Sequence, residues 1–170
     1  MHYFAYGSNL WYPRMRQRVG PLPRPRVATL DGYGLRWHKR SRDGSGKCDI
    51  VPSPGNVVHG AIYELAPAQL ATLDDIEGVG NGYRRDDTLV AMCDESRVRV
   101  VAYVAEWAFV DDSLVPYDWY RDIVVSGARA LGFPAEYIST MERQRVTEDP
   151  VRARALTERA VLERTASTGA

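Results

Sequence analysis

A chain of 170 residues is long enough to build one domain around a single hydrophobic core. Its 45% hydrophobic and 26% charged residues exclude the compositions of disordered chains and of membrane proteins. The 22 basic and 22 acidic residues cancel, which argues against a general nucleic-acid binder, leaves only a local basic patch open, and favours a small-molecule ligand.

Strand patterns dominate the first two thirds of the chain. Short apolar or alternating runs predict strands at residues 3–6, 26–40, 48–51, 57–65, 83–92 and 98–107. The last of these runs is dense in valine and aromatic residues, which favours a central strand. Between the third and fourth runs, Pro52-Ser53-Pro54-Gly55-Asn56 is typical of a tight turn, so we expect a hairpin there.

Helical patterns interrupt and then replace the strands. A helix is predicted to begin at Pro67 and to end before Gly78, a residue suited to a left-handed cap. Leu70, Leu73 and Ile76 recur every third residue and predict its buried stripe. Three more helices are expected, at residues 120–132, 134–146 and 152–164, followed by a frayed tail over residues 165–170. Strands followed by helices indicate an α+β domain whose mixed sheet curls towards a barrel.

The segment Tyr6-Gly7-Ser8-Asn9-Leu10 closes the first predicted strand. A glycine followed by two small polar residues lets consecutive backbone N–H groups converge on an anion. The same residues equally suit a plain helix cap, with Ser8 or Asn9 capping a helix that runs to Arg18. A hydrolase nucleophile at Ser8 is not favoured, because the Gly-x-Ser-x-Gly elbow is missing.

A second segment, Leu73-Asp74-Asp75-Ile76-Glu77-Gly78, ends the helix predicted at residues 67–77. Glu77 lies in the last turn, where the helix dipole is negative, and Asp74 shares its face. Both features disfavour the ionised carboxylate, which suits a group that takes up and releases a proton. The alternative is an ordinary exposed acidic helix end.

These two segments, together with Tyr83 in Gly82-Tyr83-Arg84-Arg85, resemble the gamma-glutamylcyclotransferase family, also called AIG2-like. The resemblance covers residues 1–146 and implies a small mixed β-barrel-like sheet with surrounding helices. It implies cleavage of a gamma-glutamyl amide by its own α-amine, which gives 5-oxoproline and a free amine, with Glu77 as the catalytic residue. It also implies a substrate-binding set: Tyr6, Gly7, Ser8, Asn9, Leu10, Tyr83, Tyr103 and Tyr120. Each of these tyrosines has the alternative explanation of an ordinary core residue.

No cofactor or metal is expected. His2, His38 and His59 have no partner at ligand spacing, and Cys48 and Cys93 lack the paired spacing of a zinc site. Two unpaired cysteines are typical of a reduced intracellular protein, and the N-terminus shows no charged leader. We therefore expect a cytoplasmic protein with no membrane or nucleic-acid partner.

Several questions stay open at this level. Ser8, Asn9 and Leu10 side with relatives that act on free gamma-glutamyl amino acids or that deprotect a natural-product intermediate. A non-catalytic binding or regulatory module on the same fold is the alternative function. Residues 147–170 are interpreted as a helical extension of the domain; their interleaved Glu and Arg suit either a homodimer contact or a solvated face.

Overall fold

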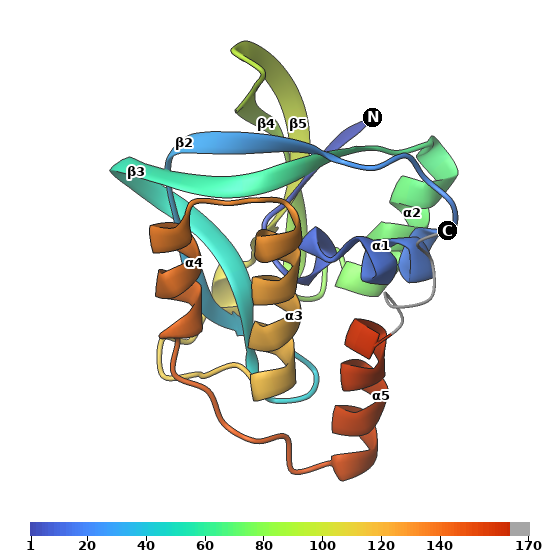
Figure 1. Ribbon diagram of the computed structural model, residues 1–170, viewed down its shortest axis with the longest axis vertical. Helices are drawn as coiled ribbons and strands as arrows, with labels where there is room; N and C mark the ends of the chain where they lie inside the picture. The colour runs from blue at the N-terminus through green and yellow to red at the C-terminus, as the bar shows by residue number, and fades with distance from the viewer. Residues whose placement is uncertain (164–170) are drawn as a thin grey trace.

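Five strands close into a barrel in the computed structural model, which describes residues 1–163 (Figure 1). The strands are β1 (His2–Ala5), β2 (Arg26–Arg40), β3 (Gly46–Glu64), β4 (Tyr83–Cys93) and β5 (Ser96–Ala105), in the spatial order β1-β3-β2-β4-β5. All pairings are antiparallel except that of β1 with β5, through Tyr3 and Val101. This mixed, closed sheet confirms the expected α+β barrel, and β5 has a partner on each side, as predicted.

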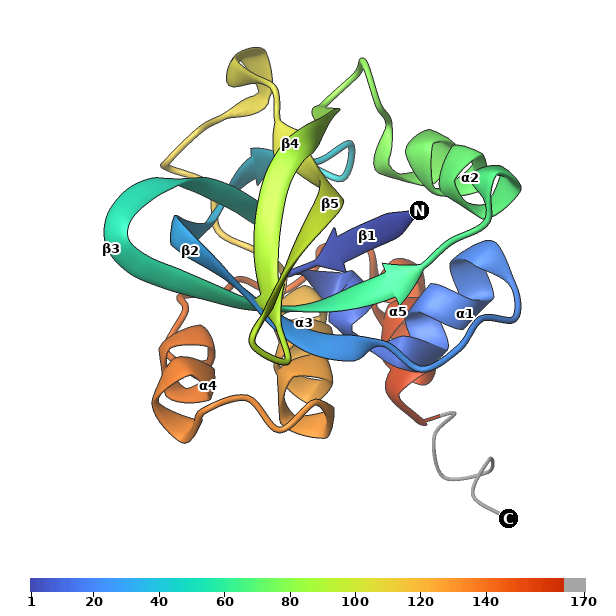
Figure 2. The same ribbon diagram turned by 90° about the horizontal axis from the view of Figure 1, so that it is seen from above.

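Helices surround the barrel on two sides. The helical elements are η1 (Ser8–Leu10), α1 (Tyr12–Val19), α2 (Pro67–Glu77), η2 (Trp107–Phe109), α3 (Asp118–Ala130), α4 (Ala135–Glu142) and α5 (Arg152–Glu163). Seen from above, α1 and α2 lie together on one side of the barrel, and α3 and α4 lie beneath it (Figure 2). Helix α5 contacts α1 and α3. Residues 165–170, for which a frayed tail is expected, lie outside the described residues.

The predicted hairpin at residues 52–56 is wrong. Residues 46–64 form a single bent strand, β3, and both of its halves pair with β2. Asp31 pairs with Val57 and Tyr33 with Pro52, so residues 53–56 bulge opposite a single residue of β2. The prolines and Gly55, which has a φ of 83°, bend the strand at this bulge without reversing it. Pairing with a long neighbour therefore overrode a local turn signal.

Helix boundaries follow local signals where these are strong. Helix α2 has Pro67 at its first position and Gly78 as a left-handed cap with φ 72°, as predicted. The proposed cap of α1 by Ser8 or Asn9 is wrong, because these residues form η1 and the helix begins after Trp11. Helix α4 ends at Glu142 instead of residue 146, since the chain returns to bond residues 116–118 through Thr147. Strand β5 likewise ends two residues early.

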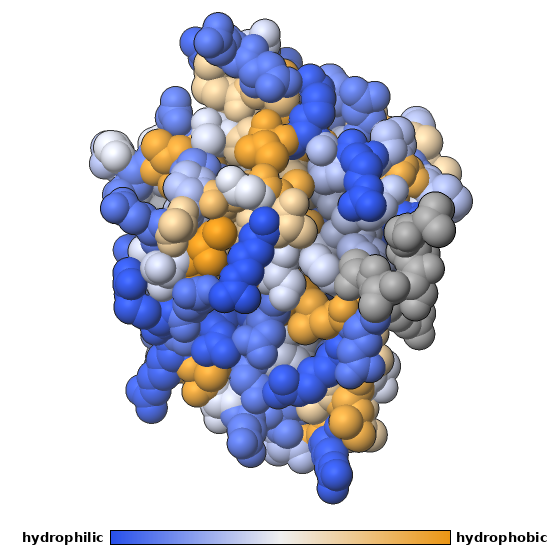
Figure 3. All heavy atoms as spheres, in the orientation of Figure 1, coloured by the Kyte–Doolittle hydropathy of each residue, from blue (hydrophilic) through white to orange (hydrophobic). Residues whose placement is uncertain are grey.

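The core lies inside the barrel and beneath it. Phe4 of β1, Met15 of α1, Leu73 of α2 and Ile123 of α3 are fully buried in it, so each helix layer is anchored to the sheet. On the face drawn in Figure 3, hydrophilic residues predominate and apolar residues form small separate groups. Within residues 1–163, none of the helices has the length and apolar character that a membrane span requires.

Candidate active site

The two segments singled out in the sequence meet at a small cavity of about 30 Å³ between the end of β1 and the end of α2. Its lining consists of Tyr3, Tyr6, Gly7, Ser8, Asn9, Cys48, Glu77, Tyr83, Tyr103 and Tyr120. The fold thus brings together all the predicted site residues except Leu10. A volume of this size has room for about two water molecules or one small polar group. We call it the inner cavity.

Leu10 lies behind the inner cavity instead of in its lining. It is 1% exposed, and its N–H donates to the Gly7 carbonyl at 2.9 Å, closing the η1 turn. Gly127 of α3 approaches the Leu10 backbone so closely that an added Cβ would lie 2.6 Å from its carbonyl carbon. Leu10 therefore supports the turn that carries Ser8 and Asn9.

Glu77 is held by two donors from other elements. Its Oε1 accepts hydrogen bonds from Arg18 Nη1 at 2.6 Å and from Asn9 Nδ2 at 2.9 Å. Arg18 also donates to Asn9 Oδ1 at 2.8 Å, which closes a triangle between α1, η1 and α2. Among residues 1–163, no hydrogen bond engages Oε2 of Glu77. One carboxylate oxygen is therefore fixed and the other is left for a ligand.

The surroundings of Glu77 differ from the sequence expectation in their charges. Asp74, which was expected to repel the Glu77 carboxylate, has partners of its own. It accepts a hydrogen bond from Tyr103 at 2.9 Å and forms an ion pair with Arg85 at 3.3 Å. Arg18 forms an ion pair with Glu77 at 2.6 Å, and the sequence argument gave no indication of this pair. Its only sequence signal is its place one helical turn after Arg14, which is a common pattern.

The predicted tyrosines line the inner cavity and are also satisfied core residues. Tyr6 donates to the Tyr103 carbonyl, and Tyr83 donates to the Cys48 carbonyl at 2.5 Å. The Tyr120 hydroxyl accepts from the Cys48 N–H at 3.1 Å. Burial raises the pKa of Tyr83 and of Tyr120 well above the usual value, so both remain neutral hydroxyls at physiological pH. Both interpretations of these tyrosines are thus compatible with the geometry.

Neither a reactive thiol nor a metal cluster accompanies these residues. Burial raises the pKa of the Cys48 thiol to about 12, which keeps it protonated and a poor nucleophile. In the part of the chain that the structure describes, no three His, Cys, Asp or Glu side chains are grouped to hold a metal ion. The groups that this site offers a ligand include the Glu77 carboxylate and the neutral tyrosine hydroxyls.

A larger outer cavity of about 230 Å³ adjoins the inner one and shares Ser8, Glu77, Tyr83 and Tyr120 with it. Six basic side chains line this outer cavity: Arg14, Arg18, Lys39, Arg40, Arg42 and Lys47. Among residues 1–163, Glu77 is the only residue in its lining that carries a carboxylate. The sequence left a local basic patch open but gave no sign that these residues, from α1, β2, β3 and the loop after β2, would meet.

Known proteins resemble this chain in both sequence and fold. The family model described as "Gamma-glutamyl cyclotransferase, AIG2-like" matches residues 3–122, which include both segments and Glu77. Human gamma-glutamylcyclotransferase is 30% identical over 147 aligned residues, with 79% of this chain and 73% of the human protein covered. The mouse protein of the same name is 29% identical over the same shares.

Among solved structures, one named gamma-glutamyl cyclotransferase superposes with a TM-score of 0.81 at 24% identity, covering 96% of this chain and 98% of its own. A second, from an uncharacterized human protein, superposes with a TM-score of 0.75 at 28% identity, covering 86% and 88%. Both solved structures therefore share the fold of this chain over most of its length.

Proposed function

Because the chain belongs to the AIG2-like gamma-glutamyl cyclotransferase family, we propose that it cleaves a gamma-glutamyl amide into 5-oxoproline and a free amine. The observation that carries this proposal is the position of Glu77, whose carboxylate lies where the two cavities join. A scissile amide bound across this junction would have one end in each cavity. The carboxylate would then lie beside the bond that breaks.

The substrate supplies its own nucleophile. The α-nitrogen attacks the γ-carbonyl carbon, a five-membered lactam forms, and the bond from that carbon to the amide nitrogen breaks. The α-ammonium must lose one proton before it attacks, and the same nitrogen loses a second as the lactam forms. The departing nitrogen takes up two protons and leaves as an ammonium. No water is consumed, because the nucleophile belongs to the substrate. Holding the two ends of the glutamyl chain together accounts for much of the rate, because the attack is intramolecular.

We assign both proton transfers to Glu77. Its Oε2 is the oxygen that no described residue engages, while Arg18 and Asn9 hold Oε1 in place. The carboxylate can accept a proton from the attacking nitrogen and then deliver it to the leaving nitrogen, once for each of the two protons. A positioned acid–base group of this kind contributes about 10²- to 10⁴-fold in rate.

The turn at residues 7–9 is assigned the binding of the glutamyl head. Gly7 packs so tightly that an added Cβ would lie 3.1 Å from both Cys48 Cβ and the Tyr120 hydroxyl. A glycine at this position therefore keeps the cavity wall open. Backbone N–H groups of this turn would hold the α-carboxylate or the oxyanion that develops on the carbonyl.

The test compares wild type with Glu77→Gln on a panel of gamma-glutamyl amino acids, with 5-oxoproline quantified by mass spectrometry. We expect turnover by wild type and a loss of about 10²- to 10⁴-fold in the variant. Glu136→Gln, which changes an exposed glutamate of α4, is the matched control and should behave as wild type.

Full activity of Glu77→Gln would remove the proton-transfer role from this residue. Tight binding of the panel without turnover by folded wild type would instead identify a binding module on this fold.

A further inference from the structure

The outer cavity gathers more positive charge than nearby carboxylates neutralise. Four of its basic side chains are paired, as Arg14–Glu158, Arg18–Glu77, Arg40–Asp111 and Lys47–Asp43. Lys39 and Arg42 have no ion pair among residues 1–163, which leaves an excess of two positive charges. A ligand that fits this cavity should therefore be anionic.

Lys39 is the clearest sign of a missing partner. The residue is 7% exposed, and its ammonium lies 4.4 Å from the centre of the Tyr83 ring. Gly82 makes room for it, because a Cβ there would lie 2.9 Å from Nζ. Burial lowers the pKa of Lys39 by more than the nearby Glu77 and Asp43 carboxylates raise it, as expected for a cation that has lost water and has no direct ion pair among residues 1–163. The aromatic ring compensates this loss only in part.

The glutamyl head cannot supply the missing negative charge. It carries one α-ammonium and one α-carboxylate, which cancel. The inner cavity, where we place part of this head, has no basic residue in its lining. Glu77 lines both cavities, so an amide beside it directs its amine portion into the outer, basic cavity. The compensating charge must therefore come from the leaving amine.

We infer that the preferred substrates are gamma-glutamyl amides whose leaving amine is itself anionic, of the class of the acidic amino acids. Lys39 and Arg42 are the residues that recognise the anionic groups of this amine. Two unpaired cations match the two carboxylates of a dicarboxylic amino acid, and a phosphate on an amine of similar size offers the same chemistry. This inference rests on the cyclotransferase function proposed above.

The test uses substrate pairs in which one member carries an additional anionic group. Gamma-glutamyl-glutamate is compared with gamma-glutamyl-glutamine, and gamma-glutamyl-phosphoserine with gamma-glutamyl-serine, by kcat/KM for 5-oxoproline release. We expect about a tenfold or greater preference for the anionic member, carried mainly by KM. The preference should shrink as salt is raised, because part of this cavity is open to solvent. The pair that shows the larger preference tells whether the cavity recognises a carboxylate or a phosphate.

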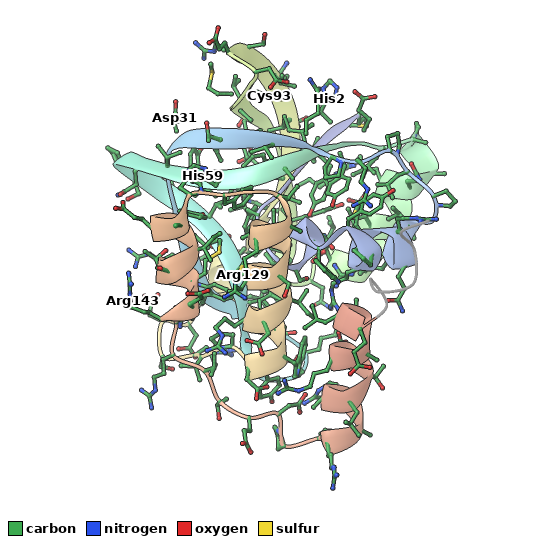
Figure 4. The ribbon with its side chains drawn as sticks, in the orientation of Figure 1. His2, Asp31, His59, Cys93, Arg129 and Arg143 are labelled. Atoms are coloured by element: carbon green, nitrogen blue, oxygen red, sulfur yellow. The ribbon has the colours of Figure 1, made fainter. Side chains whose placement is uncertain are left out.

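Three variants test whether Lys39 and Arg42 cause the preference for the anionic substrates. Lys39→Met should reduce the ratio between charged and neutral substrates several-fold, and Arg42→Gln, at an exposed side chain, should reduce it without risk to folding. Arg143→Gln is the matched control and should keep the ratio. Figure 4 shows Arg143 directly after the end of α4, at the edge of the molecule and on the side away from α1 and α2.

Failure of this inference and failure of the proposed function give different results. Equal kcat/KM for glutamate and glutamine leaving groups, and for the phosphoserine pair, would overturn the inference and leave the reaction standing. Absence of 5-oxoproline with every substrate would overturn the reaction. Isothermal titration of the Glu77→Gln protein with the same pairs then still tests the cavity, and equal affinities would overturn its anion preference.

Discussion

Asn9 joins the groups of the candidate site through a single side-chain amide. Its Nδ2 donates to Glu77 Oε1 at 2.9 Å and to the Tyr3 hydroxyl at 2.8 Å, while its Oδ1 accepts from Arg18. The side chain is buried, so the amide has few other partners available. Glu77 therefore depends on Asn9 for its orientation as well as on its own helix.

Replacing Asn9 by Asp tests this dependence. The change keeps the shape of the side chain but places a carboxylate oxygen where a donor now lies 2.9 Å from Glu77, and two like charges at this distance repel. We expect kcat to fall about tenfold or more, a part of the 10²- to 10⁴-fold that a positioned acid–base group contributes. Asn56→Asp, in the exposed bulge of β3, is the control. Wild-type kinetics in Asn9→Asp would contradict the orienting role.

At the scale of elements, helix α3 sets the position of η1. Gly127 is the point of contact, since a Cβ there would lie 2.6 Å from the Leu10 carbonyl carbon and 2.7 Å from the Trp11 nitrogen. These are backbone atoms, which do not move aside as a flexible side chain does. The close approach of α3 therefore holds the turn that presents Ser8 and Asn9 to the inner cavity.

Gly127→Ala should separate these two elements. Because the added Cβ meets backbone atoms, we expect overpacking to cost about 3 kcal/mol, which exceeds the ~1 kcal/mol that alanine gains over glycine within a helix and leaves a net loss of about 2 kcal/mol in the free energy of unfolding. Urea denaturation measures the difference, and Ser126→Ala, one position earlier in α3, is the control. Turnover should fall together with stability. An unchanged or higher stability would show that α3 moves without disturbing η1.

Asp149 links the start of α5 to α3 through hydrogen bonds. This carboxylate accepts hydrogen bonds from Trp119 Nε1 at 2.9 Å and from Arg154 Nε at 2.7 Å, besides the Val151 N–H at 2.8 Å. The hydrogen bonds from Arg154 chiefly lower the pKa of Asp149 from 3.8 to about 2. A lowered carboxylate pKa means that the folded state binds the proton less readily than the unfolded state.

The contribution of Asp149 to stability should therefore be present above about pH 4 and be lost as the pH falls through about 2. The Asp149→Asn variant lacks the titrating group. A plot of Tm against pH should therefore have a smaller slope for the variant than for wild type between about pH 5 and pH 2. Thermal denaturation followed by circular dichroism measures both slopes. Parallel slopes would show that Asp149 does not contribute to acid sensitivity.

At the scale of the whole molecule, α5 packs against α1 and α3. Glu158 pairs with the buried Arg14 at 2.5 Å, the Val161 carbonyl accepts from Trp11 Nε1 at 3.1 Å, and Val161 itself is buried. Helix α5 thus supplies partners to Trp11 and to α1, the helix that also carries Arg18. The interleaved charges that suited a solvated face or a dimer contact make ion pairs within the chain here.

A chain ending at residue 146 should be markedly less stable. Removing Glu158 leaves the Arg14 charge without its partner, and breaking a buried pair costs about 3–5 kcal/mol. We expect Tm to fall by about 10 °C or more, measured by differential scanning calorimetry. Size-exclusion chromatography of both chains tests the predicted homodimer separately. An unchanged Tm would show that residues 147–170 do not stabilise the domain and that the domain ends at residue 146.

The sequence by itself determined the features that depend on neighbouring residues. Pro67 and Gly78 bounded α2 correctly, and period-two patterns located β2 to within its observed ends, because helix caps and strand alternation are local properties. The two segments around Gly7 and Glu77 were recognised for the same reason. The local turn signal at residues 52–56 failed, since β2 pairs with β3 on both sides of it.

Only the tertiary structure decided the charge around the site. Arg18 in α1 lies 59 positions before Glu77 in α2, and Lys39 reaches the outer cavity from β2. No rule of sequence spacing relates these three residues. A formal net charge of zero concealed six basic side chains around one cavity. Such ion pairs and cavities arise where elements distant in the sequence pack together, and packing depends on the whole barrel instead of any one segment.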